Sequence, residues 1–194
     1  QELDAVIGFT DPRGFTRFSS EASSAAVVGK LTVFFSAVHR AVSTRGGEVL
    51  KFMGDGAMFV FPVGDDSLSR ACEAALDAMA ELRRELDPGE LGAPDDDPSV
   101  YRFCTALHYG RVLYGNIGSV DRLDFTVLGS AVNQTARMET VAKRLREEIV
   151  VSSDFSEACQ RGFETRGRFS LLGLPSDIEV FVPTRSVAPA SAAR

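Results

Sequence analysis

The sequence predicts an α+β fold, in which an antiparallel or mixed sheet carries helices packed on one face. Two long segments, residues 21–44 and 65–87, place apolar side chains at helical spacing. Between them lie two short apolar runs, separated only by the turn at 53–56, which is typical of a hairpin. Strand patterns and a third helix follow. A hairpin flanked by long helices favours this layered architecture.

The elements of the first half follow from periodicity and from glycine. We expect strands at 4–10, 48–52 and 57–62 and helices at 21–44 and 65–87. Gly46 and Gly47 end the first helix, because paired glycines interrupt regular structure. Residues 87–98 are rich in proline, glycine and acidic residues, which predicts an exposed loop.

The second half predicts more strands and one further long helix. We expect strands near 100–108, 112–117, 122–127 and 148–152, a strand pair within 163–182, and a helix at 130–146. Residues 184–194 are expected to form a disordered tail. The interpretation is therefore one domain over residues 1–183 and a short tail.

Composition excludes several classes of protein. The chain has 194 residues, a net charge of -6 and a pI of about 5.0, which argues against a general nucleic-acid binder. No apolar run approaches the roughly 20 residues of a membrane span, so none is expected in this segment. Three widely spaced cysteines favour a reducing, cytoplasmic compartment.

The start of the chain suggests that it is part of a longer protein. No methionine begins it, and an apolar strand follows almost at once. We therefore expect an upstream regulatory domain in the full-length protein, which could also tether it to a membrane.

Two aspartates are candidate metal ligands. Asp11 follows an apolar strand and enters a glycine-containing turn, and Asp55 lies between Gly54 and Gly56 in the hairpin turn. If strand 4–10 lies beside that hairpin, the two carboxylates meet at one edge of the sheet and can hold Mg²⁺ with phosphate oxygens. Either aspartate alone is explained equally well by turn chemistry.

Four motifs, in order, resemble those of the class III nucleotidyl cyclases. They are FTDPRGFT at 9–16, GGEVLKFMGDG at 46–56, LHYGRV with GNIG at 107–118, and FTVLGSAVNQTARME at 125–139. A single Gly-Asp turn would be weak evidence, whereas four motifs in register over residues 4–183 are specific.

The resemblance implies roles for the residues of the first two motifs. Asp11 and Asp55 would hold two Mg²⁺ or Mn²⁺ ions, and the Pro12 carbonyl would add a contact. The family usually has an aliphatic residue at this position, but proline keeps its carbonyl. The backbone at Phe15 and Thr16 would meet the terminal phosphates.

The later motifs imply further contacts to the nucleotide. Arg111 would hold phosphate. Asn133 and Arg137 would orient the ribose and stabilise charge on the reacting phosphate, and their spacing of four places both on one helix face. An exposed polar helix face would be the favoured explanation of the pair if the motif stood alone.

The resemblance also implies a lysine near the triphosphate, although the match to the family is less specific at this position. Lys143 lies four residues after Glu139, where many bacterial relatives have such a lysine. Arg144 or Arg146 could serve instead.

Two positions match those that select the purine. Lys51 would donate to N1 of adenine, whereas guanylyl cyclases typically carry Glu there. Thr126 stands where many adenylyl cyclases have Asp, and threonine is similar to the subgroup that includes bicarbonate-responsive enzymes. The ordinary alternatives are a solvated lysine and a strand-forming threonine.

The resemblance thus implies the class III nucleotidyl cyclase fold with its ferredoxin-like palm core. It also implies an adenylyl cyclase that converts ATP to 3′,5′-cyclic AMP and pyrophosphate. Family sites lie between two domains, so a head-to-tail homodimer is expected. One chain would supply the metal aspartates and Arg111, and the other Lys51, Thr126, Asn133 and Arg137. The alternatives are a catalytically silent cyclase-like dimerisation module, and a guanylyl or diguanylate cyclase.

Overall fold

The computed structural model describes residues 1–64, 67–86, 102–119, 122–171, 173 and 176–184. The strands are β1 (Glu2–Pro12), β2 (Glu48–Met53), β3 (Gly56–Pro62), β4 (Phe103–Ser119), β5 (Arg122–Leu128), β6 (Ile149–Ser152), β7 (Phe163–Phe169) and β8 (Ile178–Pro183). The helices are α1 (Phe15–Glu21), α2 (Ser24–Ser43), α3 (Leu68–Leu86), α4 (Ser130–Leu145) and α5 (Ser153–Ala158).

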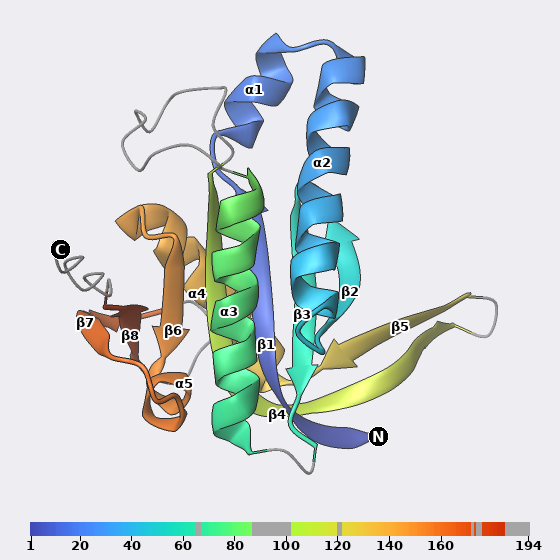
Figure 1. The fold of residues 1–194 in the computed structure, drawn as a ribbon. Helices are drawn as coiled ribbons and strands as arrows, with labels where there is room; N and C mark the ends of the chain where they lie inside the picture. The colour runs from blue at the N-terminus through green and yellow to red at the C-terminus, as the bar shows by residue number, and fades with distance from the viewer. Residues whose placement is uncertain (65–66, 87–101, 120–121, 172, 174–175, 185–194) are drawn as a thin grey trace, which may run out of the picture.

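The strands of the described residues form one mixed sheet in the order β2-β3-β1-β4-β6-β8-β7, with β5 paired to β4 (Figure 1). β4 and β6 are parallel, and the other pairs are antiparallel. This arrangement confirms the predicted α+β class, including the hairpin of β2 and β3.

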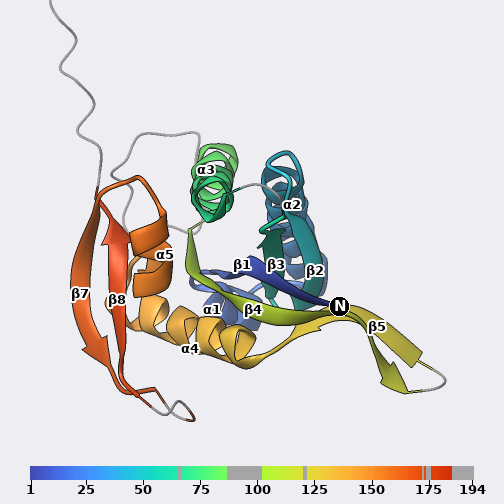
Figure 2. The same cartoon turned by 90° about the horizontal axis from the view of Figure 1, so that it is seen from below.

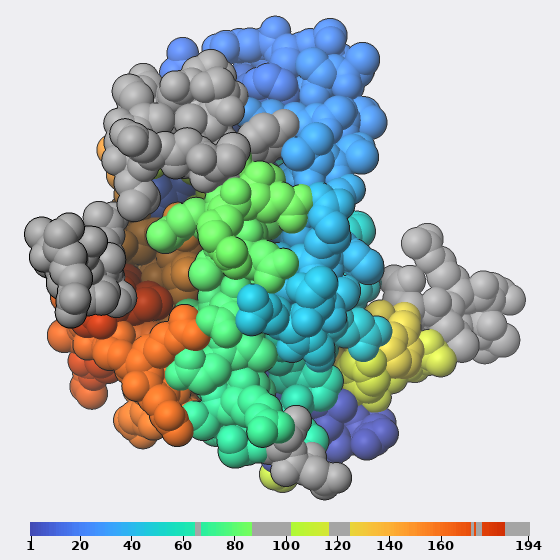
Figure 3. All heavy atoms as spheres, viewed as in Figure 1, coloured from blue at the N-terminus to red at the C-terminus, as the bar shows by residue number. Residues whose placement is uncertain are grey.

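Alternate residues of β1 face opposite layers, because successive side chains of a strand point to opposite faces. Val6 belongs to the core beneath α2 and α3, which lie side by side over one face (Figures 1 and 3). Ile7 packs with Ala131 of α4 on the other face (Figure 2). The expected helical layer is therefore present, and the structure adds α4 on the opposite face.

The helix predicted at 21–44 begins at Ser24 in the structure, and a separate short helix precedes it. Two helices occupy this region, because α1 ends at Glu21 and the chain turns before α2. Ser23 caps α2, since its Oγ accepts a hydrogen bond from the Ala26 N–H at 3.3 Å. Helix α5 was not expected at all, and its cap is the Oγ of Ser152.

Strands were predicted near 100–108 and 112–117, but one continuous strand, β4, covers both. Its first part pairs with β1, and from Leu113 onward it pairs with β5. Gly110 does not break the strand. Its lack of a side chain instead admits α4, because a Cβ there would lie 2.6 Å from Ala131 Cβ.

The hairpin of β4 and β5 extends away from the rest of the sheet (Figures 1 and 2). Leu113, Phe125 and Leu128 of this hairpin are large apolar residues that remain exposed. The predicted loop at 87–98 and all of the predicted tail except Thr184 lie outside the described residues.

One helix of the described residues, α2, has the length and apolar composition of a membrane span, contrary to the expectation from the sequence. In this fold it packs as a core helix, because Phe34, Val38 and Val42 are buried in the cluster shared with α3. Packing accounts for this buried face only, because Val28 and Val33 of α2 remain exposed.

Candidate functional site

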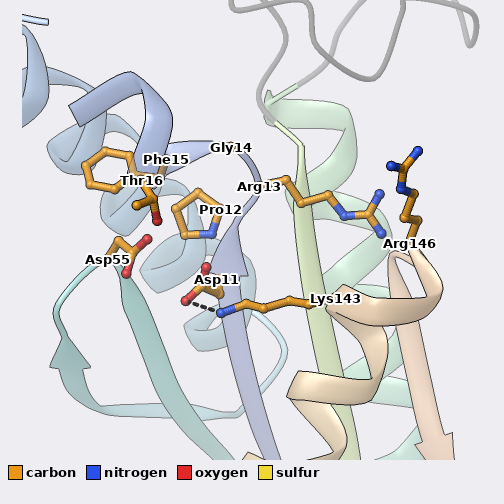
Figure 4. Close-up of a pocket in the computed structure, with 9 residues that line it drawn as sticks. All are labelled: Asp11, Pro12, Arg13, Gly14, Phe15, Thr16, Asp55, Lys143 and Arg146. Atoms are coloured by element: carbon orange, nitrogen blue, oxygen red, sulfur yellow. Dashed lines mark ion pairs between the residues drawn. The ribbon is translucent and has the colours of Figure 1, made fainter. Parts of the chain in front are cut away.

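An open cleft of about 700 Å³ lies at the end of β1 (Figure 4). The residues that line it come from the end of β1, the start of α1, the β2–β3 turn and the end of α4. They are Asp11, Pro12, Arg13, Gly14, Phe15, Thr16, Asp55, Lys143 and Arg146. Six of these residues were predicted from the sequence to contact metal or nucleotide.

Asp11 and Asp55 meet at one edge of the sheet. β1 pairs with β3 from Ala5 to Thr10, which brings the β2–β3 turn beside Asp11. A side chain at Gly56 would be crowded, because a Cβ there would lie 3.1 Å from the Thr10 carbonyl oxygen and 3.3 Å from Asp11 Oδ2. Glycine therefore allows the turn that carries Asp55 to approach the carboxylate of Asp11.

The carboxylate of Asp11 is mostly covered, with 18% of its side chain exposed. Burial raises its pKa to about 6, although the neighbouring Lys143 acts to lower it. Lys143 Nζ lies 3.0 Å from Asp11 Oδ2 and 2.7 Å from Glu139 Oε1. The two carboxylates thus share one ammonium group.

The turn after β1 presents backbone groups to the cleft. Gly14 adopts φ +69°, a left-handed conformation that suits glycine, and it begins α1. The first N–H that bonds back into the helix is that of Phe18, so those of Phe15 and Thr16 precede it. The ring of Phe15 is buried and anchors the turn.

Three polar residues near the cleft had no role assigned from the sequence. Glu139 holds Lys143 from one turn earlier in α4. Arg13 lines the cleft, and among the described residues its buried Nη2 has no hydrogen-bond partner. Arg146, earlier only an alternative to Lys143, also lines the cleft. Arg144 lies instead over the ring of Phe169, 4.9 Å from its centroid.

The residues expected to come from the second chain do not line this cleft. Asn133 and Arg137 are exposed on α4. At 100° per residue, Arg137 points about 120° around the helix from Lys143, which faces Asp11. Lys51 is half-buried on β2, and Thr126 is buried on β5. One chain therefore brings together only part of the predicted set.

Arg111 lies far from the aspartates of its own chain. It pairs across the strands with Asp4, seven residues before Asp11 on β1. At roughly 3.3 Å per residue this separates the two positions by about 23 Å. The expectation that Arg111 joins the aspartates in one half of the site is therefore not supported by the strand register.

The donor set of the cleft fits a hard divalent cation. Asp11, Asp55 and the Pro12 carbonyl supply oxygen, which Mg²⁺ and Mn²⁺ prefer. The ammonium of Lys143 already occupies a cation position on Asp11. No cluster of three or more histidine, cysteine or acidic residues able to hold a metal is found in the described part of the chain. Further ligands would have to be water or phosphate oxygens.

Comparison with known proteins supports one family. The model of the adenylate and guanylate cyclase catalytic domain matches residues 1–182. An adenylate cyclase of Anabaena cylindrica is 28% identical over 179 residues, 90% of this chain and 34% of that protein. The chain spans about a third or less of the curated relatives first matched.

Solved structures agree on the fold. A bacterial light-regulated adenylyl cyclase matches with a TM-score of 0.76 and 28% identity, covering 95% of this chain and 91% of that one. An adenylyl cyclase from P. aeruginosa matches with a TM-score of 0.79 and 22% identity, covering 96% of each chain. The latter likeness concerns the fold alone.

Proposed function

The chain belongs to the adenylate and guanylate cyclase catalytic domain family, and we propose that it is an adenylyl cyclase domain acting on ATP. The observation that carries this proposal is the meeting of Asp11 and Asp55 in a cleft that also holds Lys143 and Arg146. Paired carboxylates for metal and nearby cations for phosphate are what a metal–triphosphate substrate requires.

In the proposed reaction the ribose 3′-oxygen of ATP bonds to the α-phosphorus. The bond from that phosphorus to the oxygen bridging to the β-phosphate breaks, pyrophosphate leaves, and the hydroxyl proton passes to solvent. Asp11, Asp55 and the Pro12 carbonyl would hold two divalent cations, which supply Lewis-acid stabilisation when bound. Lys143 and Arg146 would face the phosphates from the end of α4.

We propose that a second copy of the chain completes the site in a head-to-tail dimer. Asn133 and Arg137 of that copy would orient the ribose and offset negative charge around the α-phosphorus. Both are exposed and neither lines its own cleft, so they are free to enter a partner's site. Such a site would depend on dimerisation, because no single chain holds all its parts.

Selection of adenine is proposed to depend on Lys51 and Thr126 of the second copy. A lysine ammonium donates hydrogen bonds only, so it suits the N1 acceptor of adenine and not the N1–H donor of guanine. Thr126 can accept from the exocyclic amine without a charge. The adenylyl assignment is further supported by the adenylate cyclases among the relatives, at about 28% identity.

We also propose that bicarbonate stimulates the domain, because the threonine at position 126 resembles that of the subgroup that includes bicarbonate-responsive enzymes. The test compares initial rates in bicarbonate and chloride at constant pH and ionic strength. Equal rates would remove this proposal and leave the cyclase assignment intact.

The deciding experiment is to incubate the purified domain with Mg²⁺ or Mn²⁺ and either ATP or GTP, and to identify the products by mass spectrometry. Cyclic AMP and pyrophosphate in equal amounts are expected from ATP. Cyclic GMP as the main product would make the domain a guanylyl cyclase. Absence of any cyclic nucleotide under conditions where the dimer forms would favour a silent regulatory module.

A further inference from the structure

The contact between Lys143 and Asp11 carries an inference that rests on the proposed metal role of Asp11. One ammonium bridges two carboxylates from different elements, Asp11 of β1 and Glu139 of α4, at 3.0 and 2.7 Å (Figure 4 shows the contact with Asp11). This bridge therefore joins the end of α4 to the carboxylate of Asp11, the proposed metal ligand.

The burial of the three side chains is unequal. Asp11 and Glu139 are largely covered, with 18% and 15% of their side chains exposed, whereas Lys143 is 46% exposed. The carboxylates are therefore held in place, while the lysine can swing out on its flexible stem. The ammonium is the mobile partner of this group.

The ammonium of Lys143 lies beside Asp11 Oδ2, one of the two carboxylate oxygens to which a divalent cation can bind. A metal ion binds carboxylate oxygen at about 2.1 Å, and two cations crowded on one carboxylate oxygen repel each other. A metal ion on Asp11 Oδ2 would therefore compete with Lys143 for that oxygen. The displaced ammonium keeps Glu139 as a partner and gains a second one when nucleotide phosphates enter the cleft.

We propose that Lys143 is a resident counter-ion of Asp11 that makes the cleft bind divalent cation together with nucleotide phosphates rather than alone. Glu139 acts as a positioning residue that keeps the displaced ammonium beside the phosphates. The effect of Lys143 on the affinity for metal therefore changes sign when phosphate binds. Lys143 opposes metal binding when phosphate is absent and supports it when phosphate is present.

The test measures Mn²⁺ binding by electron paramagnetic resonance at pH 8, without nucleotide and then with inorganic pyrophosphate. Without phosphate, Lys143→Met should bind Mn²⁺ on the order of tenfold more tightly than wild type, because a competing cation is gone. Addition of pyrophosphate should then raise the Mn²⁺ affinity of Lys143→Met by less than it raises the Mn²⁺ affinity of wild type.

The chain offers a matched control in the neighbouring residue. Arg144→Met removes one positive charge from the same turn of α4, but Arg144 lies over Phe169 and does not contact Asp11. Its Mn²⁺ affinity should stay within about twofold of wild type, since an exposed charge at a distance is screened. Lys143→Arg, which keeps a cation, should restore the weak binding of wild type, and Asp11→Asn should lose the site.

The inference is overturned if Lys143→Met binds Mn²⁺ no more tightly than wild type, or if Arg144→Met shifts the affinity equally. Undetectable binding to Lys143→Met, with thermal melting showing a folded protein, overturns it as well. The proposed function is judged separately by product formation in the wild type. A tighter Mn²⁺ site in Lys143→Met without any cyclic nucleotide would retain this inference and reject the cyclase assignment.

Discussion

Arg111 and Asp4 face each other across β4 and β1, with the guanidinium Nε 3.2 Å from the carboxylate Oδ1. This pair lies at the opposite end of β1 from Asp11. The cations that surround the aspartate cleft come instead from the turn after β1 and from the end of α4, as Arg13, Lys143 and Arg146. The same strand thus carries one aspartate in the site and one outside it.

Asp11→Asn and Asp55→Asn should each lower cyclase activity at least about 100-fold, since an amide is a poor ligand for a hard cation. Asp4→Asn is the matched control, because it makes the same chemical change on β1 beside the exposed Arg111, and it should retain activity within about threefold. Product formation and thermal melting are measured together. Near-normal turnover in Asp11→Asn would contradict the metal assignment.

Two inactive variants should complement each other when mixed. In a dimer of Asp55→Asn with Arg137→Ala, one site carries both substitutions and the other carries neither. Activity per mixed dimer should therefore approach about half of the wild-type value if the two sites act independently. Affinity tags of two kinds isolate the mixed dimer. A purified mixed dimer without activity would reject the shared site.

Lys51→Glu should reduce ATP turnover sharply and need not create good GTP turnover. In the wild type, a donor facing the guanine N1–H leaves polar groups unpaired, which is worth on the order of 100-fold in selectivity. The measurement is kcat/KM for both nucleotides. Lys30→Glu is the control, because it makes the same charge change on α2, and it should leave the ratio of kcat/KM for ATP to that for GTP unchanged. A wild-type preference for GTP would overturn the role of Lys51.

Gly8→Ala should destabilise the fold by about 1–3 kcal/mol through overpacking. A Cβ at this position would lie 2.1 Å from Cε2 of Phe59, which is fully buried. Gly29→Ala is the comparison, because nothing lies within 4 Å of its Cβ on α2. It should stabilise the protein by roughly 0.5–1 kcal/mol. Urea unfolding of both variants measures the difference, and equal effects would show that the contact with Phe59 relaxes.

His108 should make the free energy of unfolding depend on pH. It is buried beside Ser152, with Nδ1 2.8 Å from Oγ, and burial lowers its pKa from 6.5 to about 4. The unfolded chain therefore binds the proton more readily between these values. This contribution to stability is fully present above pH 6.5 and is lost as the pH falls toward 4, by about 3 kcal/mol in total.

Asp11 acts in the opposite direction, because its pKa is raised from 3.8 to about 6 and the folded chain then binds the proton more readily. The contribution of His108 is therefore isolated by comparing wild type with His108→Gln, which retains Asp11. The difference in their free energies of unfolding should shrink by about 3 kcal/mol from pH 7 to pH 4. A difference that is independent of pH would show that His108 does not titrate in this way.

Periodicity predicted the elements whose signal is local. The hairpin of β2 and β3 follows from two apolar runs around a glycine turn, and α3 and α4 follow from apolar residues at helical spacing. The break before α2 was missed, although Ser23 is a good helix cap. The continuity of β4 could not be predicted, because the pairing of Gly110 beneath α4 depends on a contact with Ala131.

The sequence by itself determined which residues could carry the chemistry and how each is presented locally. Asp11 at the end of a strand and Asp55 between two glycines are properties of short segments, and turn chemistry is decided by neighbouring residues. Strand pairing then brought them to one edge, as the order of elements suggested.

Only the tertiary structure decided the contacts between distant segments. The register of β1 against β4 placed Arg111 beside Asp4, and the rotation of α4 turned Lys143 toward Asp11 and Arg137 away from it. These relations depend on how whole faces pack, and a shift of one residue in register or a rotation of about 100° in a helix would reverse them. Packing over long sequence separations, which no local pattern encodes, therefore set the charge balance of the site.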